Sequence, residues 1–191
     1  MEFYKIKNER KCPAEKAGHS IKDTYEFYFK SDKSNLRYVI EATYHKNNFY
    51  AVKFYAKCHK DSKNRYSFQT CTDEPFRIMH TCTQVLPKLL EINPGASFVA
   101  VGARSISNSR IEDAESTIRF KMYRRHIYQM VKGSLEFILI DIPENSGIAL
   151  INIQDLVANY NPDTFEKDVL KIALQVKSVI LECYDDIHIP D

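Results

Sequence analysis

A run of basic residues in the middle of the chain has the composition of a phosphate-binding surface. Between Ser116 and Leu135 there is no acidic residue, and the basic ones are Arg119, Lys121, Arg124, Arg125 and Lys132. At about 100° per helical residue, one side of this segment carries Lys121, Arg124, Arg125, Tyr128 and Lys132. Such a stripe can follow a phosphate backbone and stack a base on its tyrosine, which predicts a nucleic-acid interface. An acidic protein partner and a solvated helix face are the alternatives.

The opposite, apolar side of the same segment contains an arginine and a histidine. A guanidinium in an apolar environment must be paired, because an unpaired buried charge is strongly destabilising. We therefore expect Arg119 to be largely buried, packed on Tyr123, and bonded to a carboxylate or to carbonyl groups. His126 is expected to be a packed histidine rather than a general base. The alternative is a ligand clamp or a small ribonuclease-like site, which would use Arg104, Arg119, Tyr123 and His126.

Thiol and imidazole groups lie close together in the sequence between residues 58 and 82, as they do in zinc proteins. These residues are Cys58, His59, Cys71, His80 and Cys82. Structural zinc sites take paired ligands from tight turns, whereas these residues follow irregular gaps on expected strands and a helix. The sequence therefore predicts no metal site, and it predicts reduced cysteines that behave as small apolar side chains.

The sequence signatures of the familiar enzyme families are missing. There is no phosphate loop, no nucleophile elbow, no zinc-protease motif and no dinucleotide fingerprint. One further candidate is a ligand site at the end of a buried strand, formed by Arg104, Ser107, Ser109 and Arg110. The missing motifs predict no cofactor and favour a role without catalysis.

Alternating apolar and polar residues predict the strands that position these groups. The expected strands cover residues 25–29, 36–44, 49–57, 65–71, 97–103, 135–142 and 148–153. The second and third form a hairpin, the fourth continues it as a meander, and the last two form another hairpin. Phe98-Val99-Ala100-Val101 is apolar at every position, which indicates a strand buried on both faces.

Three segments have helical periodicity. They cover residues 73–93 with a kink at Pro87, about 113–132, and about 162–184. The last carries an apolar stripe of Phe165, Val169, Ile172, Val176, Val179, Ile180 and Cys183. We expect this stripe to pack on the protein's own core, and the alternative is self-association through the helix.

Length and composition are those of one globular domain. The chain has 191 residues, a formal charge of +2 and five cysteines, with no transmembrane-length apolar run and no signal peptide. These features predict a cytoplasmic protein without a membrane partner. The elements predict a single α+β domain over residues 1–191, in which three helices pack on an antiparallel meander. Residues 1–20 are expected to be a loosely packed arm.

The order of elements also resembles a group of uncharacterised bacterial proteins of about this length. The resemblance rests on the aromatic meander, Asn93-Pro94, the strand from Phe98 to Gly102 and Arg119-x-x-x-Tyr123, and covers about residues 22–132. It implies a bacterial or mobile-element origin, because some such proteins look like parts of toxin and antitoxin or phage-related gene pairs. The first functional hypothesis is a nucleic-acid-interacting accessory protein. The second is a protein-interaction or oligomerisation module that uses the C-terminal helix, and the third is a ribonuclease-like toxin.

Overall fold

A seven-stranded sheet organises the molecule. The computed structural model describes residues 2–13, 23–69, 73–107 and 110–187. In this part of the chain the sheet has the order β1-β2-β3-β4-β5-β9-β8, and only β4 and β5 are parallel neighbours. The strands are β1 (Asn8–Pro13), β2 (Asp23–Lys30), β3 (Arg37–His45), β4 (Phe49–Ala56), β5 (Ser97–Val101), β8 (Phe137–Ile142) and β9 (Gly147–Asn152). A separate ribbon pairs β6 (Ile106–Ser107) with β7 (Arg110–Ile111).

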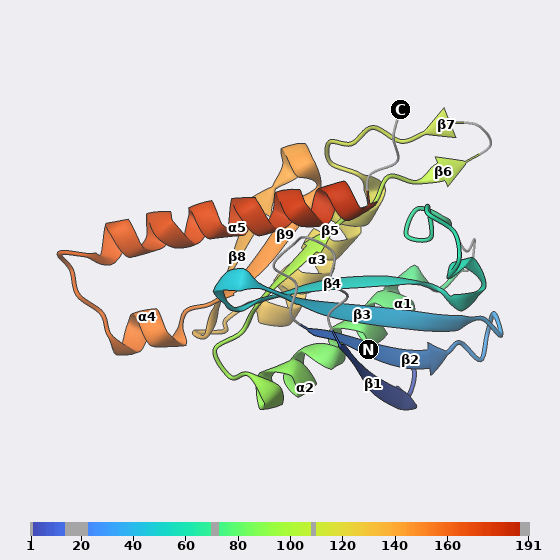
Figure 1. Cartoon of the computed structure of the whole chain (residues 1–191), viewed down its shortest axis with the longest axis horizontal. Coiled ribbons are helices and arrows are strands. Elements are labelled where there is room, and N and C mark those ends of the chain that lie inside the picture. Colours follow the sequence, from blue (N-terminus) through green and yellow to red (C-terminus); the bar gives the residue numbers. More distant parts are fainter. Residues whose placement is uncertain (1, 14–22, 70–72, 108–109, 188–191) are drawn as a thin grey trace.

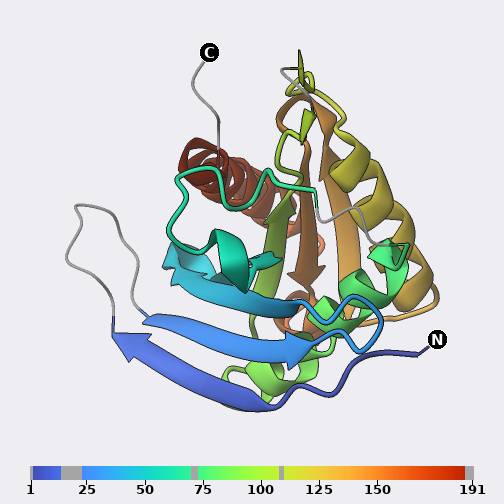
Figure 2. The same cartoon turned by 90° about the vertical axis from the view of Figure 1, so that its right-hand side faces the viewer.

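Helices cover both faces of this sheet. One face carries α1 (Pro75–Thr83), α2 (Val85–Ile92) and α3 (Ile118–Val131), and α5 (Phe165–Ile187) crosses the other (Figure 1, Figure 2). The short α4 (Gln154–Ala158) precedes α5, and single 3-10 turns span Lys46–Asn48, Lys57–His59 and Pro143–Asn145. The predicted α+β class with a mostly antiparallel sheet is confirmed.

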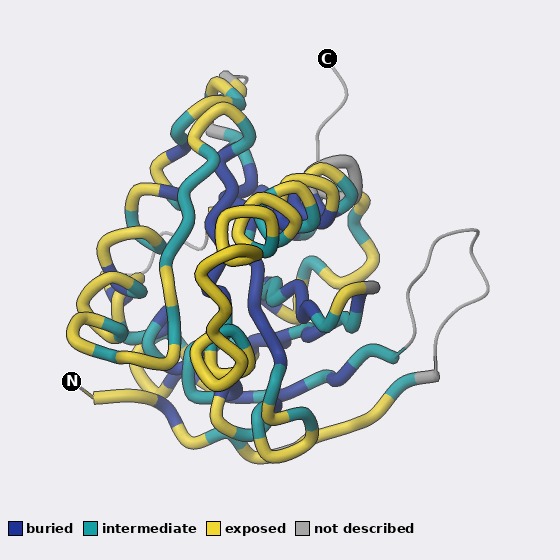
Figure 3. Tube along the Cα trace, turned by 90° about the vertical axis from the view of Figure 1, so that its left-hand side faces the viewer, coloured by how far each residue is buried: buried dark blue, intermediate teal, exposed yellow. Residues whose placement is uncertain are grey.

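The two faces of the sheet form two apolar cores. On the first face, Phe27, Ile40 and Phe98 pack with residues of α1 and α2. On the second, Val99 and Ile151 pack with α5. Buried residues accordingly concentrate along the strands, while the outer sides of the helices are exposed (Figure 3). Phe98 and Val99 belong to different cores, so the prediction that this strand is buried on both faces is confirmed.

The predicted hairpin of residues 36–57 is confirmed as β3 and β4, and the predicted strand at residues 25–29 is β2, which pairs with β3. The predicted hairpin of residues 135–153 is confirmed as β8 and β9. Of the expected N-terminal arm, Asn8–Pro13 forms an edge strand on β2 and Tyr4 is buried. Residues 14–20 of that arm lie outside the described residues.

The prediction of a strand at residues 65–71 is wrong for its described part. Residues 60–67 form turns, and only Phe68 makes a single bridge, to Ile106. The backbone N–H of Ser67 bonds to the carbonyl of Asn64 at 2.9 Å, and its carbonyl accepts one bond from Ile106 of β6 at 3.4 Å. The aromatic residues that suggested a strand serve packing, because Tyr66 is buried against Tyr55 with its ring at right angles.

The first helical segment breaks three residues before the predicted kink at Pro87. α1 ends at Thr83 and α2 begins at Val85, so the interruption lies at Gln84. Proline lacks the N–H that would bond to the carbonyl four residues earlier, and its ring clashes with that carbonyl. For Pro87 the affected carbonyl belongs to Thr83, which places the break at the end of α1.

The helix expected at about 113–132 begins later, at Ile118. Thr117 caps it by accepting a hydrogen bond from the N–H of Phe120 at 3.2 Å. Glu112 precedes the helix and accepts the N–H of Ile118 through its Oε1 at 2.6 Å. Acidic residues before the helix therefore satisfy its first donors from outside, instead of forming its first turn.

The apolar stripe of α5 is buried along only half its length. Val176, Val179, Ile180 and Cys183 are buried, whereas Phe165 is 40% and Val169 is 37% exposed. The first turns of α5 extend past the edge of the sheet (Figure 1), which explains why these two predicted core residues lie outside the core. Leu170 and Leu174 are more exposed still, on the side away from the sheet.

Two glycines let the helices on opposite faces approach the same end of the sheet. A Cβ on Gly102, just after β5, would lie 2.5 Å from the backbone nitrogen of Phe120 in α3. A Cβ on Gly147, at the start of β9, would lie 2.5 Å from Ile180 of α5. Gly102 is tied to the adjoining turn by a bond from its N–H to the carbonyl of Ser146 at 2.9 Å. Both positions therefore exclude a larger residue without displacement of a helix.

Candidate functional site

The predicted basic stripe lies on the outer side of α3. Lys121, Arg124, Arg125, Tyr128 and Lys132 are all exposed. Arg124 forms a short ion pair with Asp141 of β8, through its Nε and the Oδ2 of the aspartate. The segment from Ser116 to Leu135 contains no acidic residue, but the fold brings Asp141 of the later strand β8 next to it. The stripe keeps four exposed residues that are not in this ion pair.

The second predicted cluster divides between different environments. Arg119 is half-buried and donates from Nη2 to the carbonyl of Phe68 at 2.7 Å, and Tyr123 follows it one turn later. His126 is buried against α1, where its Nε2 lies 3.3 Å from Thr83 Oγ1 and its ring packs edge-on to His80 at 5.4 Å. Burial and the neighbouring His80 lower the pKa of His126. Arg104 donates from Nε to the carbonyl of Glu112 at 2.6 Å, in the loop before α3.

The thiols and imidazoles of the zinc hypothesis lie in separate places. Cys82 is buried on α1 and Cys58 is exposed in a 3-10 turn, while Cys71 lies outside the described residues. Within the described ranges, no three His, Cys, Asp or Glu side chains come close enough to hold a metal ion. The other predicted ligand site was the one at the end of the buried strand. Its residue Ser109 and the side chains of Ser107 and Arg110 lie outside the described part of the structure.

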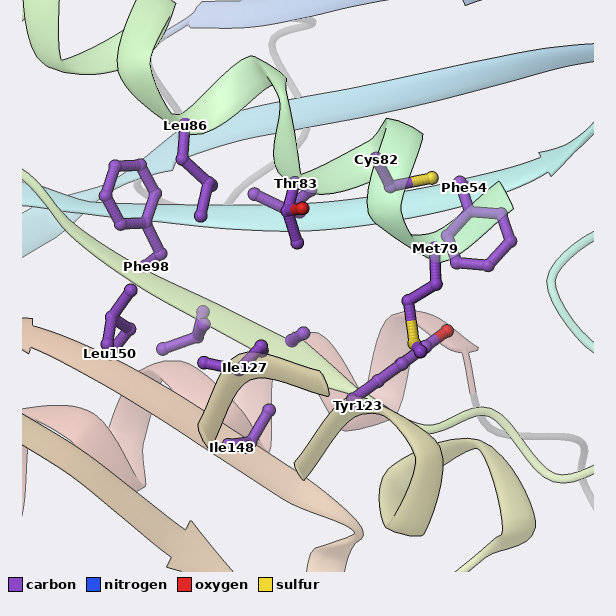
Figure 4. A pocket seen from close by; sticks show the side chains of 13 residues that line it. Phe54, Met79, Cys82, Thr83, Leu86, Phe98, Tyr123, Ile127, Ile148 and Leu150 are labelled. Carbon is purple, nitrogen blue, oxygen red and sulfur yellow. The ribbon is translucent and has the colours of Figure 1, made fainter. Parts of the chain in front are cut away.

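Sequence reasoning missed a cavity between α1, α3 and the sheet. Its volume is about 60 Å³, and its surface is almost entirely apolar. Side chains from both helices and from β5 and β9 converge on this space (Figure 4). It is lined by Val52, Phe54, Met79, Cys82, Thr83, Leu86, Phe98, Val99, Ala100, Tyr123, Ile127, Ile148 and Leu150.

Short side chains help to keep this inner cavity open. Cys82, Thr83 and Ala100 line it where α1 and α3 face each other over β5. Protein interiors are normally close-packed, so a short residue at such a meeting point leaves space that a larger one would fill. No pattern in the sequence announces this, because the three residues come from two elements that meet only in the fold.

A second cavity of about 230 Å³, the mouth, adjoins the first. Phe54, Met79 and Tyr123 line both cavities. The mouth lies at the carboxyl ends of β4 and β5, because Ala56 ends β4 and Ser105 follows β5 by four residues. Adjacent parallel strands commonly place ligand sites at this end, where the loops after both strands meet.

The mouth combines aromatic walls with polar groups. Arg65, Tyr66, Ser105 and Arg119 line it together with Tyr55 and Phe68, and its described lining contains no acidic residue. Arg65 donates to the hydroxyl of Tyr66 at 2.9 Å, and its guanidinium stacks over that ring at 4.7 Å. Glu41, behind the lining, lies 3.7 Å from Arg65 and accepts hydrogen bonds from Tyr55 and Tyr66.

Two polar atoms at the mouth are buried without a hydrogen-bond partner among the described residues. They are the Nε of Arg65 and the Oγ of Ser105, and Ser105 is only 6% exposed. Buried polar atoms are normally bonded, so these two are exceptions among the described residues. Burial also raises the pKa of Tyr123 to about 12, so its hydroxyl stays protonated at neutral pH.

One signal in the sequence did point to this region. The helical periodicity placed Arg119 on the apolar side of its helix, where a guanidinium must have a hydrogen-bonding or ionic partner. Arg65 and Ser105 lacked such a signal, because they follow strands in segments without regular structure. The residues that line the mouth together with Arg65 and Ser105 are distant from them in sequence.

Comparisons with known proteins identify no relative of this chain. No family model matches it, no curated protein matches it, and no solved structure matches it. The bacterial or phage-related origin that the resemblance implied therefore stays a prediction. In the described part of the chain, no helix has the length and apolar character needed to cross a membrane.

Proposed function

We propose that this protein binds a small, largely apolar molecule in the cavity between α1, α3 and the sheet. The observation that carries the proposal is an apolar cavity that adjoins a wider, partly polar one, the mouth, at the ends of two parallel strands. Ligand sites commonly combine mostly apolar walls with a few well-placed polar groups. The arrangement belongs to a binding protein, since His126 lies apart from the mouth against α1.

The cavity volumes set the size of the molecule. Apolar cavities of about 150 Å³ accept benzene, so the mouth, with about 230 Å³, has room for one aromatic ring. The inner cavity of about 60 Å³ adds room for a short alkyl substituent. An unfilled void of that size destabilises a protein by on the order of 1 kcal/mol, which a bound apolar group offsets.

Toluene is a suitable neutral probe for this proposal. Titration into the protein, followed by methyl NMR shifts of Met79 and Leu150 and by the thermal midpoint, should show saturable binding and a raised midpoint. Ala100→Val should weaken binding, because added methyl groups fill the inner cavity without opposing a strand conformation. Ala100→Ser is the matched control that leaves the volume almost unchanged. Equal binding by both variants, or no saturation with the unmodified protein, would refute the proposal.

A second candidate function is nucleic-acid binding on the outer side of α3. It is supported by the exposure of all five predicted residues on one face, with the aromatic Tyr128 52% exposed among the cations. Replacing Lys121 and Arg125 by alanine should weaken binding of mixed-sequence DNA or RNA and reduce the salt slope by about one per lost contact. A gel-shift experiment in which the unmodified protein binds neither DNA nor RNA at low salt would eliminate this candidate.

A further inference from the structure

We infer that the molecule bound in the cavity carries a carboxylate, held at the mouth by Arg119 with Arg65. This inference rests on the proposed function and names the chemical class of its ligand. Its starting point is the guanidinium of Arg119, which lines the mouth and donates to the neutral carbonyl of Phe68, with no ion pair to an acidic side chain of the described residues.

Charge at the mouth favours an anion. Two guanidiniums, those of Arg65 and Arg119, line it, and the described lining has no acidic side chain. Arg65 is balanced by Glu41 at 3.7 Å, whereas Arg119 bonds to the neutral carbonyl of Phe68 at 2.7 Å. The carboxylate of Glu112 accepts the backbone N–H groups of Ser105 and Ile118 beside the mouth, so Arg119 is the lining cation without a carboxylate at ion-pair distance among the described residues. A single negative charge balances it, and a doubly charged group would leave an uncompensated charge in a half-buried site.

The donor geometry favours a carboxylate over other monoanions. A guanidinium is a planar fork with five N–H donors, and it binds a planar carboxylate through two parallel hydrogen bonds. One of the donors of Arg119 is used by Phe68, which leaves the others for a ligand. The hydroxyl of Tyr123, which also lines the mouth, can donate as well.

The apolar part of the ligand then has a defined direction. Phe54, Met79 and Tyr123 line both cavities and therefore lie between them. With the carboxylate at the arginines, an aromatic ring fits between the tyrosine and phenylalanine walls of the mouth. A short apolar substituent on the far side of that ring enters the inner cavity. The ligand class is therefore a small aryl or alkyl carboxylic acid.

Matched probes separate this inference from the proposed function. Calorimetric titration at neutral pH would compare 4-methylbenzoate with toluene and with 4-methylbenzamide, which has the same shape without the charge. We expect 4-methylbenzoate to bind at least about tenfold more tightly than the amide, because charged hydrogen bonds in a half-buried site exceed neutral ones. Arg119→Met should abolish this preference, and an unchanged far-UV circular dichroism spectrum and thermal midpoint would show that the variant is folded. Arg125→Met, on the exposed side of the same helix, is the control and should preserve the preference.

Each outcome has a distinct meaning. If toluene binds but the acid gains nothing over the amide, the inference is overturned and the proposed function stands. If Arg119→Met keeps the preference, the carboxylate does not lie at this arginine and the inference is wrong. Tighter binding of 4-methylphenyl phosphate than of 4-methylbenzoate would replace the carboxylate by a phosphate ester. If none of the probes binds, the proposed function fails together with the inference.

Discussion

The different environments of two neighbouring residues of α5 give a quantitative test of how this helix packs. Val176 is fully buried against the sheet, whereas Leu174 is 63% exposed on the opposite side. Val176→Ala removes two buried carbons at about 0.8 kcal/mol each and leaves a small cavity, for a total of roughly 2 kcal/mol. Leu174→Ala removes three carbons that are mostly in water already, so its cost should stay below about 1 kcal/mol.

Urea denaturation followed by far-UV circular dichroism measures both free energies of unfolding, provided that the transition is two-state. The measurement should be repeated at two protein concentrations at least tenfold apart. A cost for Leu174→Ala equal to that for Val176→Ala would refute the assigned helix phase. A cost for Leu174→Ala that grows with protein concentration would instead show that α5 is an interface between copies. Val176→Asp should unfold the domain, because an unpaired carboxylate in this core costs more than roughly 3 kcal/mol.

Three other side chains give further predictions. Tyr4→Phe should lower stability by about 1 to 3 kcal/mol in the same urea assay, because Tyr4 donates to the buried carboxylate of Glu74; an unchanged midpoint would show that this contact is not formed. Thr117→Ala should cost about 1 to 2 kcal/mol, since it removes the α3 cap, and Thr117→Ser should restore most of it. Because burial and His80 lower the pKa of His126, its contribution to stability is present above the unfolded pKa of about 6.5 and is lost as pH falls through the folded pKa. His126→Gln should therefore reduce the stability difference between pH 7.5 and pH 5.5, with His59→Gln as the control, and an unaltered pH profile would contradict this.

Local patterns predicted most of the sheet, because strand signals depend on alternation within a few residues. Residues 36–57 show this well: the alternation of aromatic and polar residues encodes both strands and the turn between them. The error at residues 65–71 has the same source, since Tyr66 and Phe68 resemble a strand but serve packing between loops. The alternation of apolar and polar residues in the sequence indicates which residues are buried, but it does not show which residues they pack against.

The length of α5 illustrates a second limit. Its apolar stripe predicted burial from Phe165 onward, but the sheet ends before the helix does, and no residue of the helix encodes that. The candidate site was harder still to predict. Of its polar residues Arg119 and Tyr123 were predicted, because a charge on an apolar helix side, with a tyrosine one turn later, is a local signal. Ser105 and Arg65 come together at the mouth only because strands β4 and β5 pair side by side.

The close approach of helices at Gly102 and Gly147 has a consequence for local unfolding. Both helices are held at one end of the sheet, whereas the first half of α5 and the last turns of α3 are largely exposed. Amide hydrogen exchange should therefore be slowest near Phe120 and Ile180 and should quicken toward the far ends of both helices. The mouth of the cavity lies at the slow end, since Ser105 follows Gly102 by three residues and Arg119 precedes Phe120. A site held rigid before binding loses little conformational entropy when it is filled, so its selectivity is set by fit and not by closure.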